Sequence, residues 1–137
     1  VKILHDYMNE VLERDGAHVD AFYYCPHHPE HGIGIYKKKC HCRKPETGMF
    51  EMAERDLPEG IDKVHSYMIG DKRIDAQAGK NFGVTGVLVG TGYGAKEHAE
   101  DRAAGLIKED GSCPAGGYDA YADTLLDAVR GILGGRI

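Results

Sequence analysis

The stretch Val64-His-Ser-Tyr-Met-Ile-Gly-Asp-Lys72 decides the fold, because an apolar run leads here directly into glycine and aspartate. Val64 to Ile69 has the β-branched and aromatic residues typical of a strand. A helical pattern follows and ends near Phe82, and a further strand is predicted over Val84–Val89, bounded by glycines. Strands and helices that alternate at this length indicate an α/β protein with a parallel sheet.

Working outward, the same patterns predict the rest of a single domain over residues 1–137. The further predicted elements are a helix that begins at Ile3 and ends near Asp15-Gly16, a strand over Val19–Tyr24, a helix over Gly48–Arg55 capped by Thr47, an edge strand over Asp119–Ala122 and a closing helix over Leu125–Leu133. Residues 93–117 are polar and rich in glycine, which predicts a long surface loop with room for a short helix at Lys96–Ala104.

The charge and apolar content of the chain restrict its partners. A net charge of −5 argues against non-specific binding of nucleic acid, which needs a basic surface. No apolar run approaches the roughly 18 to 20 residues that cross a bilayer. Any anionic ligand must therefore be held locally, by a few basic groups and a metal ion. We expect the protein to be a monomer.

Four metal-binding side chains lie close together in a loop at residues 25–45. They are Cys25, His27, Cys40 and Cys42, which together supply three thiolates and an imidazole, a complete tetrahedral shell for structural Zn²⁺. His28 and His41 are alternative ligands in the same loop. Two disulfides are the competing interpretation, but cysteines that flank a single residue fit metal ligation better. Free thiolates would place the protein in a reducing cytoplasm.

Two further motifs flank this loop and the central strand. Arg43 and Lys44 follow the second cysteine pair directly, so that a zinc ion would fix two cations in position to clamp a phosphate. Asp71 follows the strand at the carboxyl edge of the sheet, where ligands bind in open α/β folds, and can hold Mg²⁺. Asp75 lies one helical turn later, and Lys72 can contact a phosphate. Taken alone, each motif also reads as an ordinary turn or a solvated basic pair.

Together these residues resemble the D-glycero-D-manno-heptose 1,7-bisphosphate 7-phosphatases of the haloacid dehalogenase superfamily, with the histidinol-phosphate phosphatases as a related branch. The matching stretches are Phe22-Tyr-Tyr-Cys-Pro-His-His-Pro-Glu30, Cys40-His-Cys-Arg-Lys-Pro-Glu-Thr-Gly-Met49, Ser66-Tyr-Met-Ile-Gly-Asp-Lys72 with Asp75, and Val84-Thr-Gly-Val-Leu-Val-Gly-Thr-Gly92. The resemblance covers about two thirds of the chain. It implies a cytoplasmic phosphoric monoester hydrolase with a Rossmann-like sheet.

The resemblance also implies a role for each residue of the motifs. Cys25, His27, Cys40 and Cys42 would bind structural zinc. Lys44 would neutralise the phosphate during catalysis, and Arg43, Lys44 and Lys72 would contact the sugar phosphate. Asp71 would hold catalytic Mg²⁺ with support from Asp75. The reaction of the family passes through an aspartyl-phosphate intermediate.

The sequence departs from the family in one respect: it contains no Asp-x-Asp motif, which would carry the nucleophile and the acid/base group on the first strand. The chain begins with Val1, so we expect a C-terminal portion of a phosphatase without its first two strands, inactive by itself. A non-catalytic zinc-stabilised module that binds a phosphorylated ligand or partner is the alternative. The sequence does not decide the heptose anomer.

Overall fold

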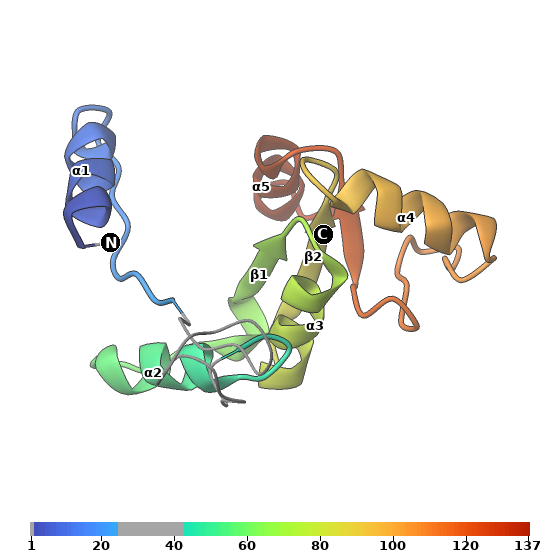
Figure 1. Cartoon of the computed structure of the whole chain (residues 1–137), viewed down its shortest axis with the longest axis horizontal. Coiled ribbons are helices and arrows are strands. Elements are labelled where there is room, and N and C mark those ends of the chain that lie inside the picture. Colours follow the sequence, from blue (N-terminus) through green and yellow to red (C-terminus); the bar gives the residue numbers. More distant parts are fainter. Residues whose placement is uncertain (1, 25–42) are drawn as a thin grey trace, which may run out of the picture.

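The computed structural model describes residues 2–24 and 43–137, and its centre is a three-stranded parallel sheet (Figure 1). The strands are β1 (Tyr67–Gly70), β2 (Thr85–Val89) and β3 (Ala120–Ala122), in the order β1-β2-β3. Tyr67 is paired with Thr85, and Val87 with Ala120. The predicted parallel α/β sheet is confirmed for these strands.

Helices precede, connect and follow the strands. They are α1 (Lys2–Glu13), α2 (Gly48–Asp56), the 3₁₀ helix η2 (Lys63–His65), α3 (Arg73–Phe82), α4 (Gly94–Ala103) and α5 (Leu125–Leu133). The helices expected after Ile3, Gly48, Lys72 and Leu125 are therefore present. Gly83 ends α3 with a φ of 103°, a left-handed conformation that glycine adopts without steric cost.

The sheet has a core on each face, because side chains of a strand alternate between its two sides. Leu88 packs on one face with Ala76 of α3 and with the buried Cys113 and Tyr118. Val87 and Val89 pack on the other face with Ala128 of α5. Gly86 lets α3 approach closely, since a Cβ at this position would meet the carbonyl oxygen of Ala76. The carboxyl ends of β1 and β2 are thus fixed relative to α3.

The strand predicted over Val19–Tyr24 is wrong. These residues have no regular structure, and both backbone groups of Val19 are bonded to the side chain of Asn9 instead of to a neighbouring strand. The backbone N–H of Val19 donates to Asn9 Oδ1 over 2.6 Å, and the Phe22 ring stacks on His5 with centroids 4.1 Å apart. The segment therefore packs on α1 and not on the sheet.

Three smaller differences concern element ends. η2 takes up the first residues of the strand predicted from Val64, so β1 begins at Tyr67. Thr47 stands at the N-cap of α2, but its side chain makes no capping hydrogen bond. The short helix predicted at Lys96–Ala104 within the loop of residues 93–117 is present as α4, which begins two residues earlier, and the loop turns inward at Cys113, which is fully buried.

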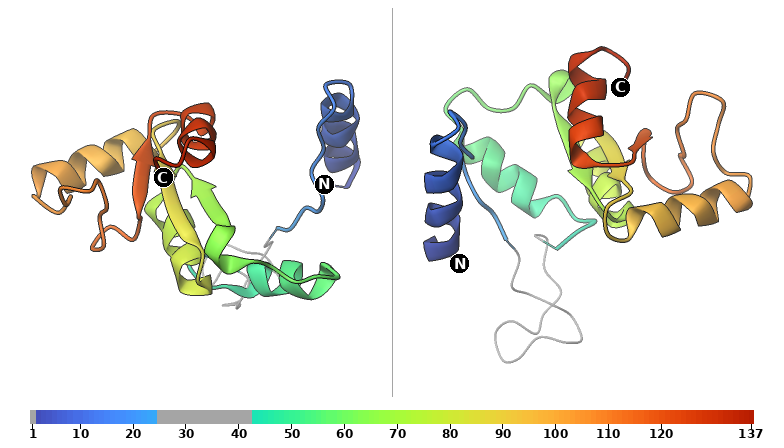
Figure 2. Two further views of the ribbon diagram at one scale, coloured as in Figure 1. Left: turned by 180° about the vertical axis from the view of Figure 1, so that it is seen from behind. Right: turned by 90° about the horizontal axis from the view of Figure 1, so that it is seen from above.

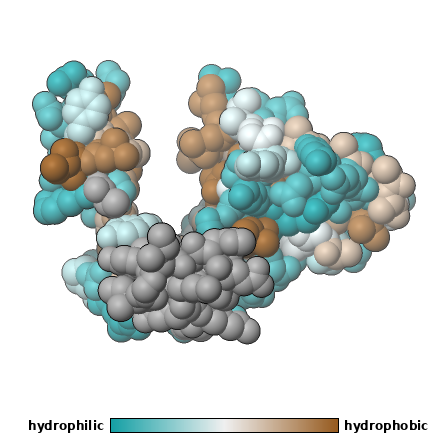
Figure 3. All heavy atoms as spheres, in the orientation of Figure 1, coloured by the Kyte–Doolittle hydropathy of each residue, from teal (hydrophilic) through white to brown (hydrophobic). Residues whose placement is uncertain are grey.

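Two helices present apolar side chains to solvent. α1 lies apart from the sheet in all three ribbon views (Figures 1 and 2), and none of its residues is buried. Its exposed apolar residues are Ile3, Leu4, Tyr7, Met8 and Val11, and those of α5 are Leu125, Leu126, Val129 and Leu133. Apolar residues are visible on both helices in Figure 3. Of the helices in the described residues, none combines the length and the hydropathy needed to cross a membrane.

Candidate functional site

Asp71 occupies the place where β1 ends and the chain turns into α3. The end of β2 lies beside it, because the two strands are paired and parallel. The backbone N–H of Tyr93 donates to Asp71 Oδ2 over 3.4 Å. Gly92 faces the same carboxylate so closely that a Cβ there would overlap with Oδ2. Asp71 is therefore held at the carboxyl edge of the sheet by the turn that follows β2.

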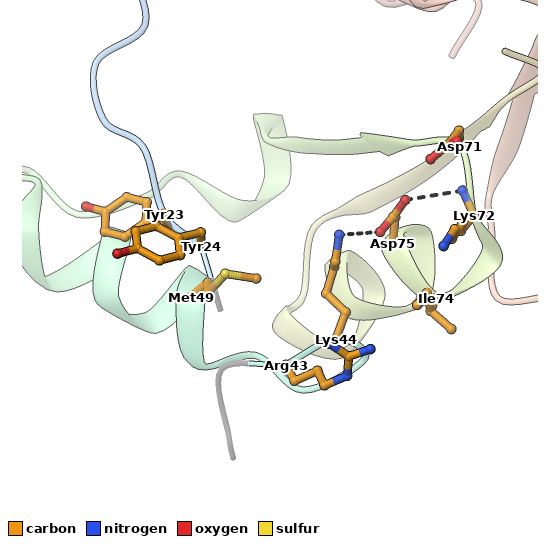
Figure 4. A pocket seen from close by; sticks show the side chains of 9 residues that line it. All are labelled: Tyr23, Tyr24, Arg43, Lys44, Met49, Asp71, Lys72, Ile74 and Asp75. Atoms are coloured by element: carbon orange, nitrogen blue, oxygen red, sulfur yellow. Dashed lines mark hydrogen bonds and ion pairs between the residues drawn. The ribbon is translucent and has the colours of Figure 1, made fainter. Parts of the chain in front are cut away.

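Asp75 is engaged by two groups from different parts of the chain (Figure 4). Its Oδ2 accepts a hydrogen bond from the backbone N–H of Lys72 over 3.2 Å, which caps the first turn of α3. Its Oδ1 lies 2.5 Å from Lys44 Nζ, and the side chain of Asp75 is only 8% exposed. Lys44 is thereby drawn from the segment before α2 to the edge of the sheet.

These residues line one cavity of about 450 Å³. It is bounded by Tyr23, Tyr24, Arg43, Lys44, Met49, Asp71, Lys72, Ile74 and Asp75. In Figure 4, the two tyrosines and Met49 lie on one side, Asp71 and Lys72 lie on the other, and Lys44 points between them toward Asp75. The structure thus brings together every candidate residue of the phosphate and magnesium motifs.

The charges around the cavity favour an anionic ligand. Arg43, Lys44 and Lys72 contribute three cations, and Asp71 and Asp75 contribute two carboxylates, one of which is paired with Lys44. Within residues 2–24 and 43–137, Arg43 makes no ion pair. Lys72 Nζ lies 4.6 Å from the centroid of the Tyr93 ring, a cation–π contact that keeps it on the rim.

Asp71 is the carboxylate best suited to hold a cation, because its one described partner is a long hydrogen bond from an amide. Mg²⁺ is usually bound through one or two carboxylates, with water and phosphate oxygens completing its shell. In the described part of the chain, no three His, Cys, Asp or Glu side chains gather as a complete metal shell. The donor set therefore fits Mg²⁺ bound together with a phosphorylated ligand.

Cys25, His27, Cys40 and Cys42 lie outside the described residues, and so do the alternative ligands His28 and His41. The predicted zinc site therefore stays a prediction.

Sequence reasoning missed the aromatic part of the site. Tyr23 and Tyr24 end the segment that was predicted as a strand, yet both line the cavity, and Tyr24 is 59% exposed. The Tyr23 hydroxyl donates to Asp56 Oδ2 over 2.7 Å, which ties this segment to the end of α2. Tyr93 was missed as well, although the glycines around it follow a predicted strand at the same edge of the sheet.

Comparison with known proteins identifies a family and several relatives. A sequence model of the HAD-hydrolase-like family matches residues 41–112. The D-glycero-beta-D-manno-heptose-1,7-bisphosphate 7-phosphatase of Haemophilus ducreyi is 47% identical over 102 residues, which are 73% of this chain and 54% of that protein. The D-glycero-D-manno-heptose-1,7-bisphosphate 7-phosphatase of Chlorobaculum tepidum is 34% identical over 139 residues, 99% of this chain and 64% of that protein.

A solved structure has the same fold over nearly the whole chain. It is the D,D-heptose 1,7-bisphosphate phosphatase of B. bronchiseptica, complexed with magnesium and phosphate, with a TM-score of 0.69 and 30% sequence identity. The match covers 98% of this chain and 63% of that one. The chain spans a little over half the length of the Haemophilus relative and less than two thirds of the solved structure.

Proposed function

We propose, because this chain belongs to the HAD-hydrolase-like family, that it carries part of the active site of a phosphatase. Its substrate would be D-glycero-D-manno-heptose 1,7-bisphosphate, from which the enzyme removes the 7-phosphate. The observation that carries this proposal is the convergence of Lys44, Asp71 and Asp75 on one cavity at the carboxyl edge of the sheet. The names of the relatives support the choice of substrate.

Lys44 would bind and neutralise the phosphoryl group. Asp75 holds its ammonium group at 2.5 Å, so the cation is positioned before the substrate arrives. An ammonium group has three donors, so it can keep this partner and still donate to a phosphoryl oxygen. Arg43, from the same segment, would bind substrate oxygens in a bidentate manner, and Lys72 would contact the substrate from the opposite rim.

Asp71 would hold Mg²⁺, with Asp75 supporting the site through Lys44 and the first turn of α3. When bound, Mg²⁺ would polarise the phosphoryl oxygens and offset the negative charge that develops on them. The Tyr93 N–H would keep the Asp71 carboxylate turned toward the cavity.

The reaction of the family also needs an aspartate nucleophile. Asp75 is poorly suited to this role, because both of its oxygens are engaged by Lys44 and by the N–H of Lys72. Asp71 is assigned to the metal, and the sequence contains no Asp-x-Asp pair. The proposal therefore assigns the nucleophile of the aspartyl-phosphate step to the whole protein and not to these 137 residues.

Cys25, His27, Cys40 and Cys42 are proposed to hold a structural zinc ion. The support is the donor set in the sequence, three thiols and an imidazole, directly ahead of Arg43 and Lys44. Histidinol phosphate as substrate, and a purely binding role, remain the alternatives from the sequence. No contact of the described residues favours either of them.

The test is the Asp71→Asn variant of the whole protein. Because asparagine removes the metal-binding charge, turnover of the heptose bisphosphate should fall by roughly 100-fold or more, with a higher Mg²⁺ requirement. Asp6→Asn is the matched control, since Asp6 forms an exposed ion pair with Lys2 on α1 and does not line the cavity. Normal activity of Asp71→Asn would contradict the assignment of this carboxylate.

A further inference from the structure

α4 is held mainly by charged and polar contacts, together with the stacking of His98 on Tyr121. Its sequence, Gly94-Ala-Lys-Glu-His-Ala-Glu-Asp-Arg-Ala103, has no apolar stripe, and only Gly94 and Asp101 are buried. Neither core cluster contains a residue of this helix. The position of its first turn therefore depends on polar contacts to its neighbours.

Arg73, the first residue of α3, supplies most of those contacts. Its Nη1 donates to Glu97 Oε2 over 2.9 Å, and its own backbone N–H donates to Glu97 Oε1 over 3.0 Å. Nη2 donates to the backbone oxygen of Glu97 over 2.9 Å and to Glu100 Oε2 over 3.0 Å. Nε donates to Asp101 Oδ2 over 3.1 Å. One guanidinium thus binds three successive acidic side chains on one side of α4.

The far end of this network is anchored in the core. Asp101 is buried, and its Oδ2 also accepts a hydrogen bond from the Tyr118 hydroxyl over 2.9 Å. Tyr118 is fully buried beside Leu88 of β2. The hydrogen bond to Asp101 is the main cause that raises the pKa of Arg73, so the guanidinium keeps its charge. Arg73 therefore connects the beginning of α3 to the core through α4.

The residues directly before α4 also contact the Asp71 carboxylate. Tyr93, whose N–H donates to Asp71, immediately precedes the helix, and its carbonyl oxygen accepts from the N–H of Glu97 over 3.2 Å. Gly92 packs on the same carboxylate. The Arg73–Glu97 pair thus connects the beginning of α3 to the beginning of α4. Asp71 lies between these two helix ends.

We infer that Arg73 is a positioning residue for the Asp71 carboxylate, acting through Glu97 and the first turn of α4. Without the guanidinium, Glu97, Glu100 and Asp101 would repel one another, and the Tyr93 N–H would no longer be held at Asp71. A carboxylate that rotates freely binds a divalent cation more weakly, since its orientation must be fixed on binding. This inference rests on the proposed function only in taking Mg²⁺ as the ion at Asp71.

The test is a titration of the whole protein with MgCl₂, followed by the amide signal of Tyr93 in ¹⁵N–¹H NMR spectra. Arg73→Met should raise the Mg²⁺ concentration at half-saturation by roughly 10-fold or more, the usual effect of losing a group that orients a metal ligand. Arg73→Lys should be intermediate, because lysine keeps the charge but not the forked geometry. Arg55→Met is the matched control, since Arg55 is exposed in the last turn of α2.

A lower melting temperature of Arg73→Met with an unchanged Mg²⁺ midpoint would mean a purely structural role and would overturn the inference. If Arg73→Met does not fold, Glu97→Gln gives the same test, and a midpoint equal to that of the wild type would also overturn it. If the whole protein hydrolyses no phosphate monoester while the Tyr93 signal still depends on Mg²⁺ and Arg73, the inference stands and the phosphatase proposal fails.

Discussion

Lys44 and Asp75 form the contact that joins the segment before α2 to the edge of the sheet. Their charged atoms lie 2.5 Å apart, and Lys44 is one third exposed whereas Asp75 is nearly buried. A lysine in this place does two things, because it both compensates a buried carboxylate and presents a cation to the cavity. Its loss should therefore affect stability and ligand binding together.

The Lys44→Ala variant should be destabilised by about 1–2 kcal/mol, because it leaves the Asp75 carboxylate without its cation. The loss is no larger because Lys44 is partly exposed to solvent. Urea denaturation measures this change, and a phosphate titration measures the parallel loss of anion affinity. Lys2→Ala is the control, since Lys2 and Asp6 form an exposed pair worth less than about 0.5 kcal/mol. Equal stability losses in the two variants would contradict the structural role of Lys44.

His98 gives the protein a pH-dependent stability. Burial lowers the pKa of this imidazole below its ordinary value of 6.5, and the positive charge of Arg102 lowers it further. The unfolded chain therefore binds the proton at a higher pH than the folded protein does. The free energy of unfolding should fall as the pH drops below 6.5 toward the lower folded pKa, and this contribution is constant above that range.

His98→Phe should remove this part of the pH dependence. Phenylalanine can keep the stacking on Tyr121, whose ring centroid lies 3.7 Å from that of His98, but it cannot titrate. The measurement is urea denaturation of both proteins between pH 5 and pH 8. The free energy of unfolding of the wild type should fall toward that of His98→Phe as the pH falls. A difference in this free energy that stays constant with pH would show that His98 does not cause the effect.

At the scale of elements, the periodic segments were predictable and the irregular ones were not. α5 has the bounds that its apolar repeat predicts, and Thr124 caps its first turn by accepting a hydrogen bond from the N–H of Asp127. Residues 19–24 have strand propensity, but they form hydrogen bonds with side chains of α1 and α2 and not with a neighbouring strand. The local sequence does not predict these hydrogen bonds, because the partner side chains come close only when the chain is folded.

The predicted zinc loop is the element with the clearest test. Chelation or Cys40→Ser should lower the melting temperature, by roughly 2–4 °C for each kcal/mol of metal-derived stability that is lost. Elemental analysis should find one zinc per chain before chelation and none afterwards. Cys113→Ser is the control, because it alters a buried core thiol and should leave the zinc content unchanged. A wild-type protein without zinc, or with cystines at these positions, would refute the prediction.

At the scale of the whole molecule, the sequence predicted which motifs lie together at the carboxyl edge of the sheet. It did not predict the contacts that fix their positions. Lys44, Asp71 and Asp75 could be assigned to one edge, because the carboxyl ends of parallel strands lie together. The Arg73 network could not be foreseen, since Glu97, Glu100 and Asp101 look like an ordinary charged helix until α4 is placed beside α3. The same holds for Tyr23, whose hydrogen-bond partner Asp56 is distant in the sequence.

The tyrosines at the cavity also have a spectroscopic consequence. The chain has eight tyrosines and no tryptophan, so no indole is present to quench their emission by energy transfer. Tyr23 and Tyr24 line the cavity, and Tyr93 lies under the Lys72 ammonium at its rim. Native ultraviolet fluorescence would therefore report occupancy of this cavity without an attached dye.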